Sequence, residues 1–172
     1  TVESDPSLPL EEGTRVECRL DGKKIFSGIV FTLKQTGDGM ISVTAYDQLR
    51  YLKNKDTFVF ENKTAGEILR LIAADFNLNT GEIEDTGYKI ESLTQENTPL
   101  LNMIYEALDL TQKSTGRQYV LYDDFGVLTL RNTENMKLSL LLDEGAIESL
   151  NYSSSIDGET YNRIKLSQNA AE

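Results

Sequence analysis

Residues 14–47 read TRVECRLDGKKIFSGIVFTLKQTGDGMISVTAYD, and this stretch decides the fold class. It divides into three strand-like runs joined at Asp21-Gly22 and Asp38-Gly39, dipeptides that readily adopt the positive φ angles of tight hairpins. The stretch therefore predicts a three-stranded antiparallel meander. Its middle run, residues 25–31, is apolar on both faces, which predicts a central strand covered on each side. Gly28 predicts a bulge or bend in that strand, so a curved barrel suits the pattern better than a flat sheet.

The single cysteine of the chain, Cys18, falls in the first of these runs. Val16, Cys18 and Leu20 alternate with polar residues and would share the inward face of a strand. One cysteine cannot form an internal disulfide, and its neighbours Glu17 and Arg19 would point to the opposite side, where they could not activate the thiol. We therefore predict a buried, inert Cys18 that packs in the core.

The hydrophobic period changes from two to 3.6 after residue 63, where helix replaces strand. Thr64 and Glu67 have the spacing of a capping box, and the helix predicted over residues 64–76 follows a short strand at residues 57–60. A second helix is predicted over residues 99–113, with Thr98 as its cap and Pro99 at its first position. Each helix has an apolar face that must pack against other elements. These faces consist of Ala65, Ile68, Leu69, Ile72 and Phe76 in the first helix and of Leu101, Ile104, Ala107 and Leu108 in the second.

The remaining residues are predicted to form strands and connections. A polar linker over residues 79–87 precedes a short strand at residues 88–93. Residues 118–122 and 127–131 form a hairpin whose turn, residues 123–126, has the composition of a tight turn. Three further strands are predicted at residues 138–142, 147–152 and 161–166.

These elements predict an α+β fold in which mostly antiparallel β-barrel or sandwich segments are interrupted by an inserted two-helix α/β module. Residues 1–60 would form part of the barrel, as the meander plus a short strand. Residues 61–135 would form the inserted module, and residues 136–172 would supply returning barrel strands. The chain begins with Thr1 rather than methionine, so we expect it to be a piece of a longer protein that contains the missing strands.

The chain is acidic, with a net charge of −11 from 28 acidic and 17 basic residues. Affinity for nucleic acids comes from Lys and Arg that release counterions from phosphates, so we predict no stable nucleic-acid binding. We also expect no export signal and no membrane insertion, because the sequence contains neither a signal-peptide pattern nor an apolar run of roughly 18 residues.

Histidine is absent from the chain, which removes the commonest general base and every Ser-His-Asp arrangement. Paired carboxylates, which can hydrolyse a glycosidic bond, are the remaining catalytic possibility. Acidic residues in turns more often form local hydrogen bonds, and the sequence favours no pair over another. Calcium-loop and nucleotide-loop spacings are missing. The candidate acids are Asp123-Asp124 in the hairpin turn, Glu82, Glu84 and Asp85 in the polar linker, and Asp143-Glu144 at a strand end.

Tyrosines could line a glycan-binding groove, although packing is their more frequent use on strands and helices. We therefore predict no catalytic residue, no cofactor and no metal site. Purified protein should not hydrolyse peptidoglycan, and Asp124→Asn or Glu84→Gln should have only small effects on stability. The tyrosines in question are Tyr46, Tyr51, Tyr105, Tyr119, Tyr122, Tyr152 and Tyr161.

A series of short stretches resembles, in the same order, the hub-protein family of the phage-like element PBSX, whose members are named XkdQ or YqbQ. Each stretch is weakly specific, but the ordered series is specific and spans about residues 13–167. The stretches are DGKKIFSG (21–28), TAYDQLRYL (44–52), NKTAGEI (62–68), DTGYKI (85–90), IYEALDLT (104–111), YDDFG (122–126) and SIDGETYNRIKL (155–166).

This resemblance implies a structural subunit of a tail hub or baseplate, made in the bacterial cytoplasm and located in the virion tail. Its expected partners are copies of itself in a trimeric ring, the tail tube and the spike or baseplate proteins, and no catalytic residues are implied. Acids in residues 82–85 or at Asp143-Glu144 would face the channel of such a ring. The alternatives are a cell-wall hydrolase that uses loop carboxylates and a tail module that binds glycans through its tyrosines.

Overall fold

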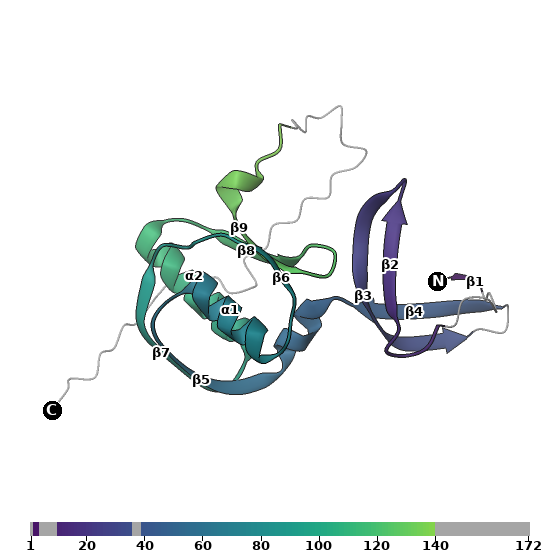
Figure 1. Cartoon of the computed structure of the whole chain (residues 1–172), viewed down its shortest axis with the longest axis horizontal. Coiled ribbons are helices and arrows are strands. Elements are labelled where there is room, and N and C mark those ends of the chain that lie inside the picture. The colour runs from purple at the N-terminus through teal and green to yellow at the C-terminus, as the bar shows by residue number, and fades with distance from the viewer. Residues whose placement is uncertain (1, 4–9, 36–38, 140–172) are drawn as a thin grey trace, which may run out of the picture. The chain divides into compact units, whose positions relative to one another are not determined.

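The structure is a computed structural model that describes residues 2–3, 10–35 and 39–139 (Figure 1). The chain divides into two units, Thr1–Lys137 and Leu138–Glu172, and nearly all described residues belong to the first. Most strands in this part pair antiparallel and two α-helices accompany them, so the predicted α+β class is confirmed. Of the strands predicted at the C-terminus, only Leu138 and Ser139 are described. The domain limits drawn from the sequence therefore stay a prediction.

The N-terminal sheet contains four antiparallel strands. Its order is β1 (Val2–Glu3), β4 (Met40–Tyr46), β3 (Lys23–Gln35) and β2 (Arg15–Leu20). The meander predicted for residues 14–47 is confirmed, with β3 in the middle.

The turn between β2 and β3 has the geometry expected from its sequence. Asp21 and Gly22 have φ angles of 50° and 77°, as two-residue hairpin turns require. At the next turn Gly39 has a φ angle of 80°, whereas Asp38 lies outside the described residues.

Of the bulge or bend predicted at Gly28, the bulge is wrong. Gly28 pairs in register with Val16, and the irregularities of the sheet lie elsewhere, between Cys18 and Arg19 and between Val30 and Thr32. A Cβ atom at Gly28 would lie 2.5 Å from the main-chain oxygen of Tyr46. The position therefore needs glycine because the end of β4 approaches it closely.

The prediction of a buried Cys18 is wrong, because this side chain is exposed. Leu20, on the same strand, is 65% exposed, and Ile25 on β3 is 60% exposed. The predicted cover on each side of β3 is present only in its middle, where Ser27 and Val30 on opposite faces are 2% and 1% exposed. Alternation in the sequence identifies which side chains share a face, but it does not reveal whether anything packs on that face.

The first half of the α/β module is a long two-stranded ribbon that surrounds two helices. After the 3-10 helix η1 (Gln48–Lys53), β5 (Lys55–Thr64) pairs antiparallel with β7 (Lys89–Pro99). Figure 1 shows this ribbon curving around α1 (Ala65–Asp75) and α2 (Leu100–Thr115).

The start of α1 is fixed by the capping box that the sequence predicts. The Thr64 hydroxyl accepts a hydrogen bond from the Glu67 amide at 3.2 Å, and the Glu67 carboxylate accepts one from the Thr64 amide at 2.8 Å. This second bond is the main reason that the pKa of Glu67 lies below its usual value. Both bonds satisfy amides that have no partner within the helix.

The start of α2 differs by one residue from the prediction. Pro99 occupies the N-cap position without a side-chain hydrogen bond, and Thr98 lies in β7, where it pairs with Asp56. The Thr98 hydroxyl donates a hydrogen bond to the Glu96 carbonyl and therefore does not cap the helix. At the other end, Gly116 has a φ angle of 72° and ends the helix, as left-handed glycine commonly does.

A three-stranded sheet completes the module. Its order is β6 (Thr80–Ile83), β9 (Leu128–Asn132) and β8 (Tyr119–Asp123), and the 3-10 helix η2 (Thr133–Met136) follows β9. The predicted hairpin is confirmed as the antiparallel pair of β8 and β9. The polar linker predicted over residues 79–87 is partly wrong, because it contains β6, which pairs parallel with β9.

The hydrophobic core of the described residues lies within the module. Most of each predicted helix face is buried, and Leu69 and Ile104 are each 0% exposed. Phe76 and Leu101 are only partly buried, whereas Leu100 and Met103, which the prediction omits, are 0% exposed. Among the described residues, no helix has the length and apolarity required to cross a membrane. The core side chains are Leu52, Phe60, Ala65, Ile68, Leu69, Ile72, Ala73, Ile83, Ile90, Leu93, Leu100, Met103, Ile104, Ala107, Leu108, Tyr119, Leu121, Leu128 and Leu130.

Thr86 is buried beside this core with an unsatisfied hydroxyl. The residue is 0% exposed, and its hydroxyl has no hydrogen-bond partner. Replacing a buried, unpaired hydroxyl with a methyl group removes its desolvation cost at nearly constant volume. We expect Thr86→Val to raise the free energy of unfolding by about 1 kcal/mol, measured by urea denaturation.

Thr111 provides a matched control for this substitution. It is also 0% exposed, but its hydroxyl donates a 2.8 Å hydrogen bond to the Ala107 carbonyl. Thr111→Val should therefore leave stability unchanged or lower it. Equal destabilisation by both substitutions would mean that the Thr86 hydroxyl has a partner in solution.

Candidate functional site

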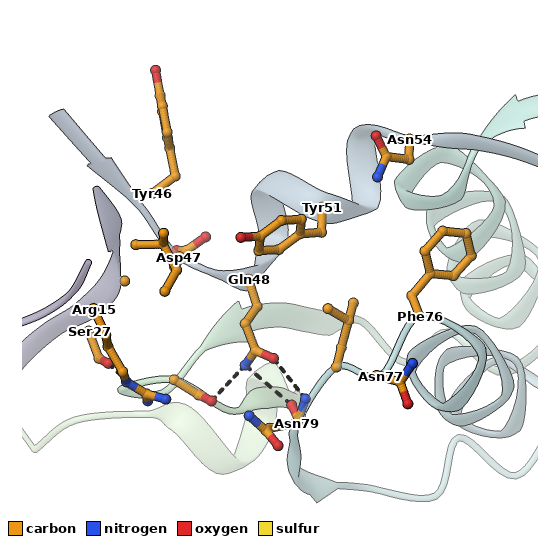
Figure 2. A pocket seen from close by; sticks show the side chains of 14 residues that line it. Arg15, Ser27, Tyr46, Asp47, Gln48, Tyr51, Asn54, Phe76, Asn77 and Asn79 are labelled. Carbon is orange, nitrogen blue, oxygen red and sulfur yellow. Dashed lines mark hydrogen bonds between the residues drawn. The ribbon is translucent and has the colours of Figure 1, made fainter. Parts of the chain in front are cut away.

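A cavity with a volume of about 300 Å³ lies where the N-terminal sheet meets the α/β module. Figure 2 shows its polar side chains, with the Gln48 side chain pointing toward Asn79. Its lining combines an apolar part with a polar rim. The lining residues are Arg15, Ser27, Gly28, Ile29, Tyr46, Asp47, Gln48, Tyr51, Asn54, Phe76, Asn77, Leu78, Asn79 and Gly126.

Gln48 is the central hydrogen-bonding residue of this cavity. Its oxygen accepts from the Asn79 amide at 2.7 Å, and its nitrogen donates to the Gly126 carbonyl at 2.6 Å. The same nitrogen lies 3.3 Å from a carboxylate oxygen of Asp123. One side chain at the start of η1 thus joins the beginning of β6 to the β8–β9 turn, and no pattern in the sequence predicts this arrangement.

Asp47 precedes Gln48 and caps η1 through a 3.0 Å hydrogen bond from the Leu49 amide. Partial burial raises the pKa of Asp47, and the nearby negative charge of Asp123 raises it further. The Leu49 hydrogen bond acts in the opposite direction and is the smallest of the three effects.

The candidate acids that the sequence identifies do not form a cluster. Asp123 accepts a 2.6 Å hydrogen bond from the Gly126 amide within its own turn, and Asp85 accepts one from the Gly87 amide at 3.0 Å. Glu82 and Asp124 are exposed, whereas Asp143-Glu144 lies outside the described residues. In the part of the chain that the structure covers, no three acidic or cysteine side chains are placed to hold a metal ion.

Glu84 has a structural position at the end of β6. Its carboxylate accepts hydrogen bonds from the Asn132 amide and the Asn135 side chain, each at 3.0 Å, and lies 3.5 Å from Arg131. The Asn132 amide is the main reason that the pKa of Glu84 is lowered, and Asn135 and Arg131 lower it further, although desolvation opposes them. The carboxylate therefore joins β6 to the end of β9.

We expect Glu84 to make stability depend on acid pH. Its pKa is lower in the folded than in the unfolded chain, so the unfolded chain binds more protons between the two values. The contribution is complete above the unfolded pKa and disappears as pH falls through the folded one. In urea denaturation, Glu84→Gln should be less stable than the parent at pH 7, and the difference should shrink from about pH 5 downward.

Asp124→Asn is the control for this pH dependence, because the Asp124 side chain is exposed. Its stability should follow that of the parent at every pH. A constant difference between Glu84→Gln and the parent from pH 7 to pH 3 would contradict the assigned role of the ionised carboxylate.

The tyrosines do not gather into a groove. Tyr46 and Tyr51 line the cavity, Tyr119 is buried, and Tyr105 on α2 is 46% exposed. Tyr122 is partly buried on β8, whereas Tyr152 and Tyr161 lie outside the described residues.

Comparison with known proteins identifies the family. A sequence profile described as YQBQ-like matches residues 1–172. The chain belongs to the YQBQ-like family. It is 41% identical over 160 residues to "Uncharacterized protein YqbQ" of Bacillus subtilis strain 168, covering 91% of this chain and 48% of that protein. It is 39% identical over 160 residues to "Phage-like element PBSX protein XkdQ" of the same strain, and the alignment covers 91% of this chain and 49% of that protein.

The chain thus spans about half the length of the YQBQ-like relatives that it matches. Among solved structures, the 43 kDa tail protein of prophage MuSo2 from Shewanella oneidensis aligns with a TM-score of 0.58 at 16% identity. The alignment covers 72% of this chain and 38% of that protein. At this identity the likeness shows a shared fold.

Proposed function

We propose that the chain is part of a structural subunit of a phage tail, prophage or tail-like bacteriocin hub or baseplate. The observation that carries this proposal is the similarity to a PBSX protein over 91% of the chain. The fold shared with a prophage tail protein supports it. In the proposed assembly the subunit forms a trimeric ring that joins the tail tube to the spike.

The N-terminal sheet supports an assembly role because one of its faces is apolar and only partly covered. Residues that pair across neighbouring strands have their side chains on the same face of the sheet. Cys18 pairs with Phe26, and Leu33 pairs with Val43. All four side chains lie on one face. Cys18 is exposed and the other three are partly buried. Further apolar surface must cover this face in the complete protein or its assembly.

The edge of the same sheet points to the same conclusion. In the described residues β2 is the last strand, and its outer edge pairs with no other strand. An unpaired edge beside an apolar face is suited to the addition of strands, as happens when a barrel closes or a ring forms. If a ring forms, the exposed acids Glu82 and Asp85 are candidates to face its channel.

The proposal is tested on particles released from the bacterium that encodes the protein. An epitope-tagged, full-length protein should remain with purified tails, and a cryo-electron map should place three copies between tube and spike. Absence of the protein from tails that are otherwise complete would rule out the hub role. A position on the tail surface with variable occupancy would support a binding module instead.

A hydrolase is the second candidate, and one observation favours it. Asp47 lines the cavity with a raised pKa and lies near Asp123, as an acid and its partner do in glycosidases. However, both carboxylates accept hydrogen bonds from main-chain amides that fix local structure. We therefore expect no turnover of purified peptidoglycan, and activity abolished by Asp47→Asn would replace the structural proposal with this one.

A further inference from the structure

The N-terminal sheet and the α/β module do not share a hydrophobic core. All core side chains belong to the segment from Leu52 to Leu130, and none belongs to β2, β3 or β4. Within the described residues after β1, the chain passes from sheet to module once, between Tyr46 and Gln48. The relation between the two parts must therefore depend on contacts outside the core.

The β8–β9 turn, residues 123–126, supplies these contacts. Its Phe125 ring faces two cations of the β2–β3 hairpin, with Arg19 at 4.9 Å and Lys24 at 5.1 Å from the ring centroid. Cations within about 6 Å of an aromatic face are attracted to it. Phe125 and Gly126 have φ angles of 54° and 92°, so the turn uses an uncommon backbone conformation to present this ring.

The next residue of the turn fits closely against the sheet. A Cβ atom at Gly126 would lie 2.5 Å from the Arg15 guanidinium and 3.2 Å from the Ser27 hydroxyl. These two side chains are joined by a 3.2 Å hydrogen bond. The Gly126 carbonyl accepts the 2.6 Å hydrogen bond from Gln48, so both β2–β3 and η1 hold the same turn.

We propose that the β8–β9 turn is a latch that locks the N-terminal sheet to the α/β module, and that Gln48 positions it. The contacts of the latch are polar or cation–π, and an open cavity of about 300 Å³ lies beside them. Residues 123–126 contribute no side chain to the module core, so the joint can open while both parts stay folded. The proposal does not depend on the role of the protein in a tail.

The test measures the distance between the two parts in the full chain. Cys18 is the single cysteine, it is exposed on β2, and Lys113→Cys adds a second label site at an exposed position of α2. Nitroxide labels on both sites allow the distance distribution to be measured by pulsed electron paramagnetic resonance. With the latch intact, we expect one narrow distribution.

Two variants remove different halves of the latch. Phe125→Ala removes the ring between the cations, and Gln48→Ala removes the hydrogen bond to Gly126. We expect each variant to broaden the distribution at least twofold, while amide exchange in α1 and α2 stays as slow as in the parent. Phe125→Tyr, which keeps an aromatic face, and Gln112→Ala, at an exposed site on α2, should give the parent distribution.

Two outcomes would overturn the latch. If both Phe125→Ala and Gln48→Ala keep the narrow distribution, other contacts hold the joint. If either variant speeds amide exchange throughout α1 and α2, the turn belongs to the cooperative core of the module and is not a separate device.

Discussion

Leu69→Asp is expected to unfold the α/β module. Leu69 is 0% exposed and belongs to a core of apolar side chains from α1, α2 and the surrounding strands. A carboxylate at this position loses its hydration and gains no charged partner, which costs more than about 4 kcal/mol. For a domain of about 80 residues, such a loss lowers the melting temperature by more than about 15 °C. Thermal denaturation followed by circular dichroism measures it.

Leu71 provides a matched control two residues along the same helix. Its side chain is 45% exposed, so the same substitution, Leu71→Asp, leaves the new charge in water. We expect a cost below about 1 kcal/mol, as for other surface substitutions. Ile104→Asp, at a position on α2 that is 0% exposed, should repeat the large effect. Similar melting temperatures for Leu69→Asp and Leu71→Asp would mean that the assigned helix face is wrong.

The helices could be predicted from the sequence because their determinants are local. The spacing of Ile68, Leu69 and Ile72 depends on residues within one or two turns, and Thr64 and Glu67 cap the helix through neighbouring amides. The turn at Asp21-Gly22 could also be predicted, because the conformations of these two residues alone determine it. Local rules of this kind hold in almost any tertiary context, so the structure departs from them by a residue or so at helix ends.

Features that depend on distant parts of the chain were missed. The strand β6 contains one apolar residue, Ile83, and its parallel partner β9 lies more than forty residues later, so alternation gives no signal. Gln48 bonds to Asn79 and Gly126, which are 31 and 78 residues away. A glutamine at the start of a short helix is common and carries no signal of such long-range bonds. The cavity and the contacts of Gln48 could therefore be found only from the structure.

Cys18 shows a different limit of sequence reasoning. Its pairing with Phe26 places it on the apolar side of the sheet, as alternation predicts. Its exposure depends on what else covers that side, which the residues of β2 do not specify. The prediction of the face was sound, but the prediction of burial required knowledge of elements beyond the described sheet.

Gly28→Ala is expected to destabilise the N-terminal sheet, although alanine is usually preferred to glycine inside a strand. Removing the extra backbone freedom of glycine should by itself stabilise a strand by roughly 0.5–1 kcal/mol. At Gly28 the new Cβ would lie 2.5 Å from the Tyr46 oxygen and 2.8 Å from the Tyr46 carbonyl carbon. Phe26, whose ring would also lie at 2.5 Å, can rotate, but the main chain of β4 cannot move without breaking its register with β3.

Overpacking of this kind costs about 1–3 kcal/mol, so the net effect of Gly28→Ala should be a loss of stability. Hydrogen exchange of the β3 and β4 amides in the full chain measures this loss locally, and urea denaturation measures it globally. Gly81→Ala is the comparison, because the atoms nearest its Cβ would be side-chain atoms of Val127 and Thr129, at 2.8 Å and 3.0 Å, and not main-chain atoms. Those side chains can adjust, so we expect the smaller effect there. If Gly28→Ala slows exchange in β3 and β4, the close approach of Tyr46 does not exist in solution, and the glycine has no steric role.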